Sequence, residues 1–300
     1  MNSVPTALTA LSATAALADL NTAAEVIWQN SIQSCPGLSV DVLPSVGSTN
    51  TVLMEQARKG LTTPTLLTAV TQTAGRGRQG RQWAAQPGDS LTFSLGLPLR
   101  LEQIPGGGSA LSLAVGLALA SAIDAAFAQL GYPAPPTQIK WPNDLWWQQR
   151  KLGGILIEAT NAPSLSPQQR WVVIGVGLNV HPVPDMPQSA CMQAHWPDDA
   201  PPLTPGQVWA WVAPELIRAV LRFEQTGFGP LLAAYQARDA LFGHPVNLWT
   251  RPGSADLASQ EPSQSGLAQG VNEQGALLVH TGDQIQTWTS GDVSVRLQTP

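Results

Sequence analysis

The spacing of hydrophobic and polar residues changes along the chain, and these changes predict where helices and strands lie. Stretches rich in Ala and Leu predict helices, and five are expected, over residues 6–30, 49–58, 108–130, 205–224 and 230–240. Ser48 is a suitable N-cap for the second helix, and Gly60 is placed to end it.

Short apolar or alternating runs bounded by turn residues predict strands. Before residue 180 they are expected over residues 38–46, 65–71, 90–97, 138–140, 144–147, 152–159 and 171–175. Residues 180–206 contain seven prolines and no clear periodicity, so a long loop is expected there. After His244 only short β-like runs follow, over residues 246–250, 266–271, 276–280, 285–288 and 293–297, which is typical of a small barrel.

This order of elements predicts an α+β protein in three parts. Residues 1–36 form a helical extension, residues 37–242 a mixed domain, and residues 243–300 a small β-barrel. Residues 252–265 are rich in Ser, Gln and Pro and are expected to form a hairpin insertion.

Charge is scarce, which makes its placement informative. Only 12% of the 300 residues are charged, about half of the usual fraction, whereas 43% are hydrophobic, so a large core is expected. The first cation is Arg58, although a DNA-binding arm or a secretory signal would need cations in residues 1–57. No nucleic-acid partner is therefore expected.

Neither a membrane span nor a disulfide framework is expected. The most apolar stretch, residues 109–123, is about 15 residues long, short of the roughly 20 needed to cross a bilayer. Cys35 and Cys191 form neither a disulfide framework nor a zinc quartet. These features predict a cytoplasmic protein.

Residues 72–81 form a loop rich in Gly and Arg. Its glycines satisfy the dinucleotide-binding spacing G-x-G-x-x-G, but no helix is predicted after the loop to receive a pyrophosphate. Three of the chain's twelve arginines lie here, namely Arg76, Arg78 and Arg81. Arginines among glycines suit an anion site for carboxylate or phosphate, and a solvated basic loop is the alternative.

A second charged cluster contains two of the three lysines. Lys140 and Lys151 flank Asp144, and a hairpin of two strands would bring them to one site. Asp144 is suited to hold Mg²⁺ or to accept a proton, and a plain hairpin with a salt bridge is the alternative. Together the two clusters suggest a reaction between two anions, such as a carboxylate and ATP.

Ordered sequence blocks over about residues 40–300 resemble the bacterial biotin protein ligases, also called biotin–[acetyl-CoA-carboxylase] ligases. The blocks are Ser48-Thr49-Asn50, residues 72–83, 140–144, 151–158 and 174–179, and, near the end, residues 275–278 and 291–296. The cation-free start resembles the family form without an N-terminal DNA-binding domain.

The resemblance implies a fold and a reaction. The expected fold is a mixed-sheet catalytic domain related to class II aminoacyl-tRNA synthetases, followed by an SH3-like barrel. Biotin and Mg·ATP would give biotinyl-5′-AMP, from which biotin passes to a lysine of the biotin carboxyl carrier protein. Relatives of this fold can pair as homodimers.

It also implies roles for particular residues. Expected biotin contacts are Ser48, Thr49, Asn50, Gln72, Arg76, Gly77, Arg78, Lys151 and Gly154. Expected ATP contacts are Arg78, Arg81, Asn143, Asn179, Trp196 and Arg296. The catalytic residues would be Arg76, Arg78, Lys151 and Asp144, and Asp144 would also hold the metal.

Three other functions compete with this one. A lipoate ligase also adenylates a carboxylate, but the Arg-Gly-Arg loop and the barrel favour biotin. A DNA-binding biotin sensor is opposed by the cation-free start. An esterase is suggested by Gly88-Asp89-Ser90-Leu91, but no Asp-x-x-His follows to supply the base.

Overall fold

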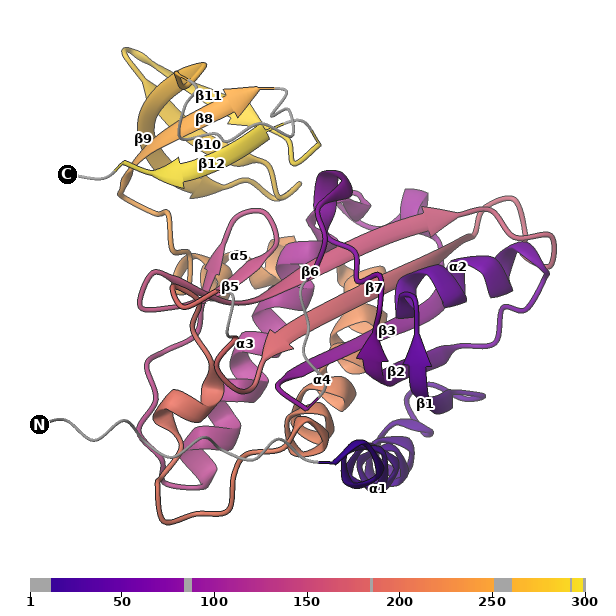
Figure 1. The fold of residues 1–300 in the computed structure, drawn as a ribbon. Coiled ribbons are helices and arrows are strands. Elements are labelled where there is room, and N and C mark those ends of the chain that lie inside the picture. The colour runs from indigo at the N-terminus through magenta and orange to yellow at the C-terminus, as the bar shows by residue number, and fades with distance from the viewer. Residues whose placement is uncertain (1–11, 84–87, 184–185, 251–260, 292, 299–300) are drawn as a thin grey trace, which may run out of the picture.

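A seven-stranded mixed sheet forms the centre of the larger part of the molecule (Figure 1). The computed structural model describes residues 12–83, 88–183, 186–250, 261–291 and 293–298. The strand order is β1-β2-β3-β7-β6-β5-β4, and only β1 and β2 run parallel among these neighbours. The strands are β1 (Ser39–Val46), β2 (Thr65–Gln72), β3 (Ser90–Leu99), β4 (Gln138–Lys140), β5 (Asp144–Trp147), β6 (Arg150–Thr160) and β7 (Arg170–Asn179).

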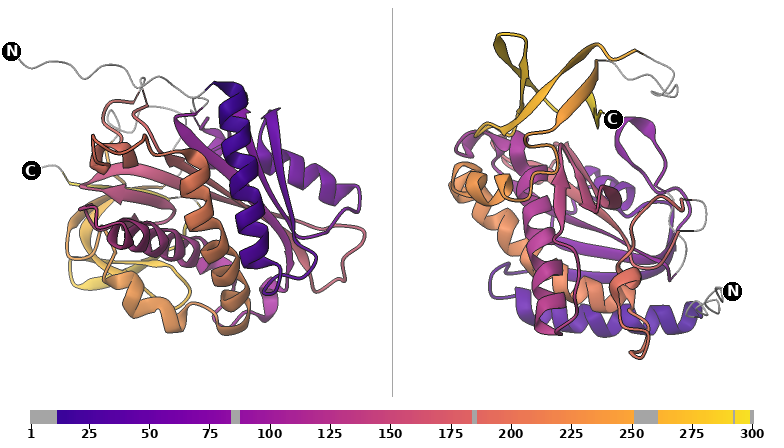
Figure 2. Two further views of the ribbon diagram at one scale, coloured as in Figure 1. Left: turned by 90° about the horizontal axis from the view of Figure 1, so that it is seen from below. Right: turned by 90° about the vertical axis from the view of Figure 1, so that its left-hand side faces the viewer.

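Helices cover both faces of this sheet. Three long helices pack side by side on one face (Figure 2), namely α1 (Ala13–Ser31), α3 (Leu111–Gln129) and α4 (Pro205–Thr226). The shorter α2 (Thr49–Arg58) lies on the other face. Adjacent residues of one strand lie on opposite faces of the sheet. In β7, Val172 belongs to the core under the long helices, whereas Trp171 packs with Leu53 of α2.

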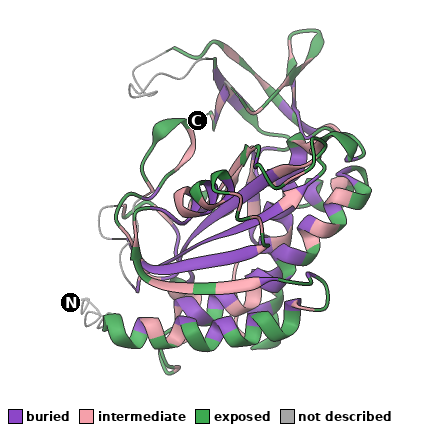
Figure 3. Ribbon diagram, turned by 90° about the vertical axis from the view of Figure 1, so that its right-hand side faces the viewer, coloured by how far each residue is buried: buried purple, intermediate pink, exposed green. Residues whose placement is uncertain are grey.

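The long apolar helix is a core element, as expected. By length and composition, Gly108–Gln129 is the one helix among the described residues that could cross a membrane, yet 72% of its most apolar stretch is buried inside the protein. It begins after the 3₁₀ turn Gly108–Ala110. It packs against β4, β5 and β6, and the central strands β3 and β7 are also largely buried (Figure 3).

A five-stranded antiparallel sheet follows at the C-terminal end. It has the order β11-β10-β9-β8-β12. Its strands are β8 (Pro245–Thr250), β9 (Gln264–Val271), β10 (Leu277–Thr281), β11 (Gln284–Trp288) and β12 (Val293–Leu297). The connection between β9 and β10 is bonded to the larger part of the molecule, since Trp141 Nε1 donates to Gly275 O at 3.0 Å and Ser109 Oγ donates to Gln274 O at 2.5 Å.

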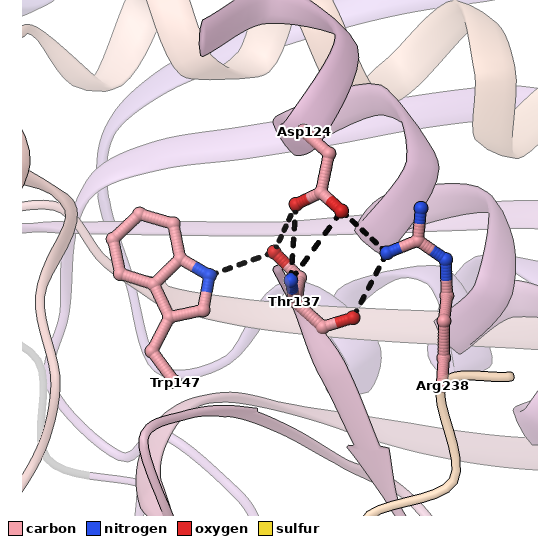
Figure 4. Close-up of polar contacts among 4 residues, drawn as sticks. All are labelled: Asp124, Thr137, Trp147 and Arg238. Carbon is pink, nitrogen blue, oxygen red and sulfur yellow. Dashed lines mark hydrogen bonds and ion pairs between the residues drawn. The ribbon is translucent and has the colours of Figure 1, made fainter. Parts of the chain in front are cut away.

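A polar cluster anchors the segment that leads into this second sheet (Figure 4). Asp124 of α3 accepts from Thr137 Oγ1 at 2.7 Å and pairs with Arg238, which also donates to Thr137 O at 3.0 Å. The indole N–H of Trp147 donates to Thr137 Oγ1 at 2.7 Å. Next to this cluster, Ile139 N donates to Arg238 O at 2.8 Å. The start of β4 and the connection to the second sheet are therefore held together.

Most predicted elements are present, with three differences. The helix expected over residues 230–240 is only the 3₁₀ turn Gly229–Leu231 and α5 (Leu232–Gln236), because residues 238–240 pair with Ile139 instead. The run at 171–175 is part of the longer β7, and residues 264–265 of the expected insertion belong to β9. Residues 6–11 of the first expected helix and residues 252–260 of the insertion lie outside the described residues.

Arg238→Ala is expected to lower the free energy of unfolding by about 2 kcal/mol, because it leaves the partly buried Asp124 carboxylate without its cation. Urea denaturation of the full chain measures this change. The matched control is Arg218→Ala, which removes one side of an exposed pair with Glu215 and should change stability by less than about 0.5 kcal/mol. Equal losses in both variants would contradict the anchoring role of Arg238.

Candidate active site

One cavity lies between the mixed sheet and the second sheet, and it gathers residues from widely separated segments. Its volume is about 210 Å³. Of the residues predicted for the site, those that line it are Ser48, Thr49, Asn50, Gln72, Arg76, Gly77, Arg78, Arg81, Asn143, Asp144, Lys151, Gly154 and Arg296. The two charged clusters seen in the sequence therefore face the same space.

Neutral polar side chains occupy one end of this cavity. Thr49 and Asn50 stand at the start of α2 and are buried. The backbone N–H of Thr49 donates to Gln72 Oε1 at 2.7 Å, and the hydroxyls of Thr49 and Ser94 lie 2.6 Å apart. Ser94 Oγ in turn donates to Asn50 Oδ1 at 2.6 Å. This end is suited to a neutral ligand group that needs several hydrogen bonds once desolvated.

Glycines of β6 and β7 make room for the side chains that lie on this part of the sheet. A Cβ at Gly175 would overlap the amide of Asn50, and one at Gly177 would overlap the indole of Trp83. A Cβ at Gly154 would meet Lys151 Nζ at 3.3 Å. The glycines therefore admit the protein's own side chains.

The Gly/Arg loop forms a tight hairpin between β2 and β3. Gly77 N donates to Arg81 O at 2.7 Å, and Trp83 N donates to Gly75 O at 3.0 Å. Gln79 has a φ of 55°, and a three-residue 3₁₀ turn, Arg78–Gly80, takes the place of the helix that a dinucleotide fold requires. The loop is therefore not a dinucleotide-binding turn.

Two arginines of this loop contact distant parts of the chain. Arg76 forms an ion pair with Glu158, with Nη2 2.9 Å from Oε1. Arg78 donates to Asn143 Oδ1 at 3.1 Å and to the carbonyl of Ser290, which precedes β12. Burial lowers the pKa of Arg78, since desolvation disfavours its charged form and outweighs the attraction of Asp144.

Cations dominate the cavity lining. Its charged residues comprise six cations and one carboxylate, Asp144, the cations being Arg76, Arg78, Arg81, Lys140, Lys151 and Arg296. Lys151 Nζ lies 2.8 Å from Asp144 Oδ1 and 5.5 Å from the centre of the Trp83 ring. Burial lowers the pKa of Lys140 to about 8, although Asp144 opposes the shift. This excess of positive charge suits a strongly anionic ligand.

Two predicted residues do not line the cavity. Asn179 is fully buried at the end of β7, where its Nδ2 donates to Ala190 O at 3.1 Å. Trp196 lies in an aromatic cluster with Phe127, Tyr132 and Trp211, and its Nε1 donates to Pro201 O at 2.7 Å. The structure therefore places the Trp196 indole in a buried aromatic cluster and not in the lining of this cavity.

Four further residues belong to the site although the sequence predicted no binding or catalytic role for them. Trp83 and Lys140 line the cavity, and Ser94 and Glu158 bond to residues that do. Trp83 and Glu158 fall inside recognised sequence blocks, and the scarcity of lysine drew attention to Lys140. Ser94 gave no signal, because a serine in an alternating strand looks ordinary.

Comparison with known proteins identifies the class. Residues 42–179 match the model of the biotin/lipoate A/B protein ligase family, and residues 258–296 match the biotin protein ligase C-terminal domain. The chain is 34% identical to the bifunctional ligase/repressor BirA of Escherichia coli, over 87% of this chain and 75% of BirA. It is 33% identical to the biotin–[acetyl-CoA-carboxylase] ligase of Mycobacterium tuberculosis, over 85% and 88% of the two chains.

Solved structures agree at the level of the fold. The biotin protein ligase of Aquifex aeolicus in complex with biotin and ATP has a TM-score of 0.66 at 24% identity, over 87% of this chain and 99% of that one. The matches, the mixed sheet and the cationic cavity define the protein as a ligase, and thus an enzyme. Within that class, the chain belongs to the biotin protein ligase family.

Gly175→Ala is expected to destabilise the protein by about 1–3 kcal/mol, because the new methyl group would displace Asn50 from the sheet. Urea denaturation measures the loss. Gly47→Ala is the matched control, since a Cβ at Gly47 meets nothing within 4 Å. A stability of Gly175→Ala equal to that of the control would mean that Asn50 is not confined as described.

Proposed function

We propose that this protein is an ATP-dependent biotin ligase that modifies the biotin carboxyl carrier protein of acetyl-CoA carboxylase. The observation that carries the proposal is a single cavity with a neutral hydrogen-bonding end beside a strongly cationic one. Biotin has a ureido ring that needs hydrogen bonds and a carboxylate that reacts. The cations then receive that carboxylate together with ATP.

In the first half-reaction, a carboxylate oxygen of biotin attacks the α-phosphorus of ATP, and pyrophosphate leaves. The biotin carboxylate and ATP repel each other because both are anions. Arg76, Arg78 and Lys151 reduce this repulsion by neutralising charge at the point where the two reactants meet. Lys151 is held for this by Asp144 and by the face of Trp83. Ser48, Thr49 and Gln72 bind the ureido ring, with Asn50 behind them.

In the second half-reaction, the amine of a carrier lysine attacks the carbonyl carbon of biotinyl-5′-AMP, and AMP leaves. The incoming ammonium must lose a proton before it attacks. Asp144 is the one carboxylate among the described residues that line the cavity, and it is the group suited to take that proton.

The ATP side of the cavity is assigned to Arg78, Arg81, Asn143 and Arg296, the last reaching it from β12. Within the described parts of the chain, no three His, Cys, Asp or Glu side chains are grouped to hold a metal. Mg²⁺ commonly binds through one or two carboxylates and substrate phosphates, so Asp144 fits as its protein contact. Bound there, Mg²⁺ would neutralise phosphate charge.

Biotin is favoured over lipoate by the neutral end of the cavity. Lipoate has no ureido group to use the hydrogen-bonding groups of Thr49 and Gln72, which would then be left unpaired. The second sheet, which supplies Arg296, matches the C-terminal domain of biotin protein ligases.

Incubation of the full chain with biotin, Mg·ATP and a carboxyl carrier domain is expected to give a product that streptavidin detects. Omission of ATP should abolish labelling. Lys151→Ala should lower adenylate formation by about a hundredfold or more, measured as pyrophosphate release, because it removes a charge from the reacting groups. Absence of ATP-dependent labelling by the unaltered protein would refute the ligase function.

The rate should also depend on the charge of Lys140. With a pKa of about 8, Lys140 is protonated below that pH and loses its charge as the pH rises through it. The value of kcat/KM for ATP is therefore expected to fall several-fold between about pH 7 and 9.

Lys140→Arg tests this assignment, because a guanidinium keeps its charge over the same range. The variant should lose the alkaline decline, even if its overall rate is lower. An unchanged decline in Lys140→Arg would assign the titration to another group.

A further inference from the structure

Glu158 of β6 does not line the cavity but bonds to Arg76 and Asn50, which do, and neither the sequence blocks nor the family comparison gives it a role. Its Oε1 is 2.9 Å from Arg76 Nη2, and its Oε2 accepts from Arg76 Nη1 at 3.1 Å and from Asn50 Nδ2 at 2.9 Å. The carboxylate therefore joins the arginine loop to the start of α2.

The carboxylate fixes how the Asn50 amide is turned. A carboxylate only accepts hydrogen bonds, so the amide nitrogen of Asn50 must face Glu158. The same nitrogen also donates to Leu156 O at 3.4 Å. The amide oxygen then points to Ser94, whose hydroxyl donates to it at 2.6 Å.

The orientation of the Asn50 amide also decides which of the Ser94 and Thr49 hydroxyls donates to the other. Ser94 has one hydroxyl proton, and Asn50 receives it, so the 2.6 Å contact between Ser94 and Thr49 requires Thr49 to be the donor. If Thr49 instead gave its proton to Gln72 Oε1, at 3.1 Å, Ser94 would have to donate to Thr49 and the oxygen of Asn50 would lose its partner. The shorter contact and the complete pairing favour the first arrangement.

The outcome is a defined pattern of donors and acceptors facing the cavity. Thr49 Oγ1 donates its proton to Ser94, so toward the cavity it can only accept hydrogen bonds. Gln72 Oε1 is occupied by the backbone N–H of Thr49, so Gln72 offers its amide N–H groups. A cyclic urea has ring N–H groups to give and a carbonyl oxygen that accepts, which complements this pattern.

We propose that Glu158 is a positioning residue that sets the direction of the hydrogen-bond chain Asn50–Ser94–Thr49 and thereby makes the neutral end of the cavity selective for a urea. The proposal rests on the proposed function, because it takes biotin as the ligand. Arg76 holds the Glu158 carboxylate in place through two contacts. Glu158 itself touches neither reactant.

Glu158→Gln tests the proposal at nearly constant volume. A glutamine amide can present either its nitrogen or its oxygen to Asn50, so only the long contact with Leu156 O would still favour one direction of the chain. The dissociation constant for biotin alone, measured by calorimetry, should rise by about tenfold. The KM for ATP in pyrophosphate release should stay within about twofold, because Lys140, Arg78 and Arg296 are untouched.

The matched control is Glu102→Gln. Glu102 loses the same charge, but its partner is Arg170 at 3.5 Å in an exposed pair. This variant should bind biotin as the unaltered protein does. Thermal unfolding of both variants checks that the fold is kept, and a biotin dissociation constant of Glu158→Gln equal to that of the control would overturn the proposal.

A double variant separates hydrogen-bond direction from a general structural role. In Asn50→Asp combined with Glu158→Gln, the new carboxylate can only accept, so Ser94 must again donate toward position 50. Biotin affinity should recover part of what Glu158→Gln loses, and affinity no better than that of Glu158→Gln alone would overturn the proposal. Failure of the unaltered protein to bind biotin would refute the proposed function instead.

Discussion

The structure depends on keeping several like charges together around one cavity before any anion arrives. In a chain with only 15 cations, six line this space, and their mutual repulsion must be balanced locally. Indole rings do much of this, since Lys151, Lys140 and Arg296 lie over Trp83, Trp146 and Trp249 respectively. An indole face stabilises a cation without neutralising its charge, so the cation can still attract an anionic ligand.

The same requirement explains why the second sheet belongs to the site. Arg296 comes from β12, and the carbonyl that holds Arg78 belongs to Ser290. Both depend on how that sheet is seated, which the Trp141–Gly275 hydrogen bond determines at one point. The Asp124–Arg238 cluster determines it at another, on the connecting segment. Trp141 at the cavity and the cluster on the connecting segment thus help to position two of the cations of the site.

Without the family resemblance, the residue pattern predicts the cationic part of this site but not its neutral part. Arg76, Arg78 and Lys151 are conspicuous because charge is scarce in this chain. The strand pattern predicts that Lys140 lies near Asp144, and the two residues are paired between β4 and β5. Hydrogen-bond partners cannot be predicted in this way. Alternation in a strand shows which face of the sheet a residue lies on, but not which side chain contacts it there.

Trp196 and Ser94 illustrate the limit in opposite directions. An aromatic residue in an aperiodic loop carries no sign of whether it faces a ligand or the core, and Trp196 packs against Phe127. Ser94 enters the site only because Asn50, from a helix 44 positions earlier, lies over Gly175. Such a contact depends on how the helix packs on the sheet, and the periodicity of the sequence does not predict this packing.

The partners of the cations also differ across the cavity, and the difference matches the two reactants. Arg76 and Lys151, assigned to the biotin carboxylate, are each paired with a carboxylate of the protein. Arg78, Lys140 and Arg296, which we propose face the ATP side, contact an amide, a carbonyl and indoles, although Asp144 also attracts Arg78 and Lys140. A monoanion needs only modest compensation, whereas a triphosphate needs cations whose charge is not offset by a direct ion pair. Under the proposed assignment, this difference in partners would favour one orientation of the two substrates in the cavity.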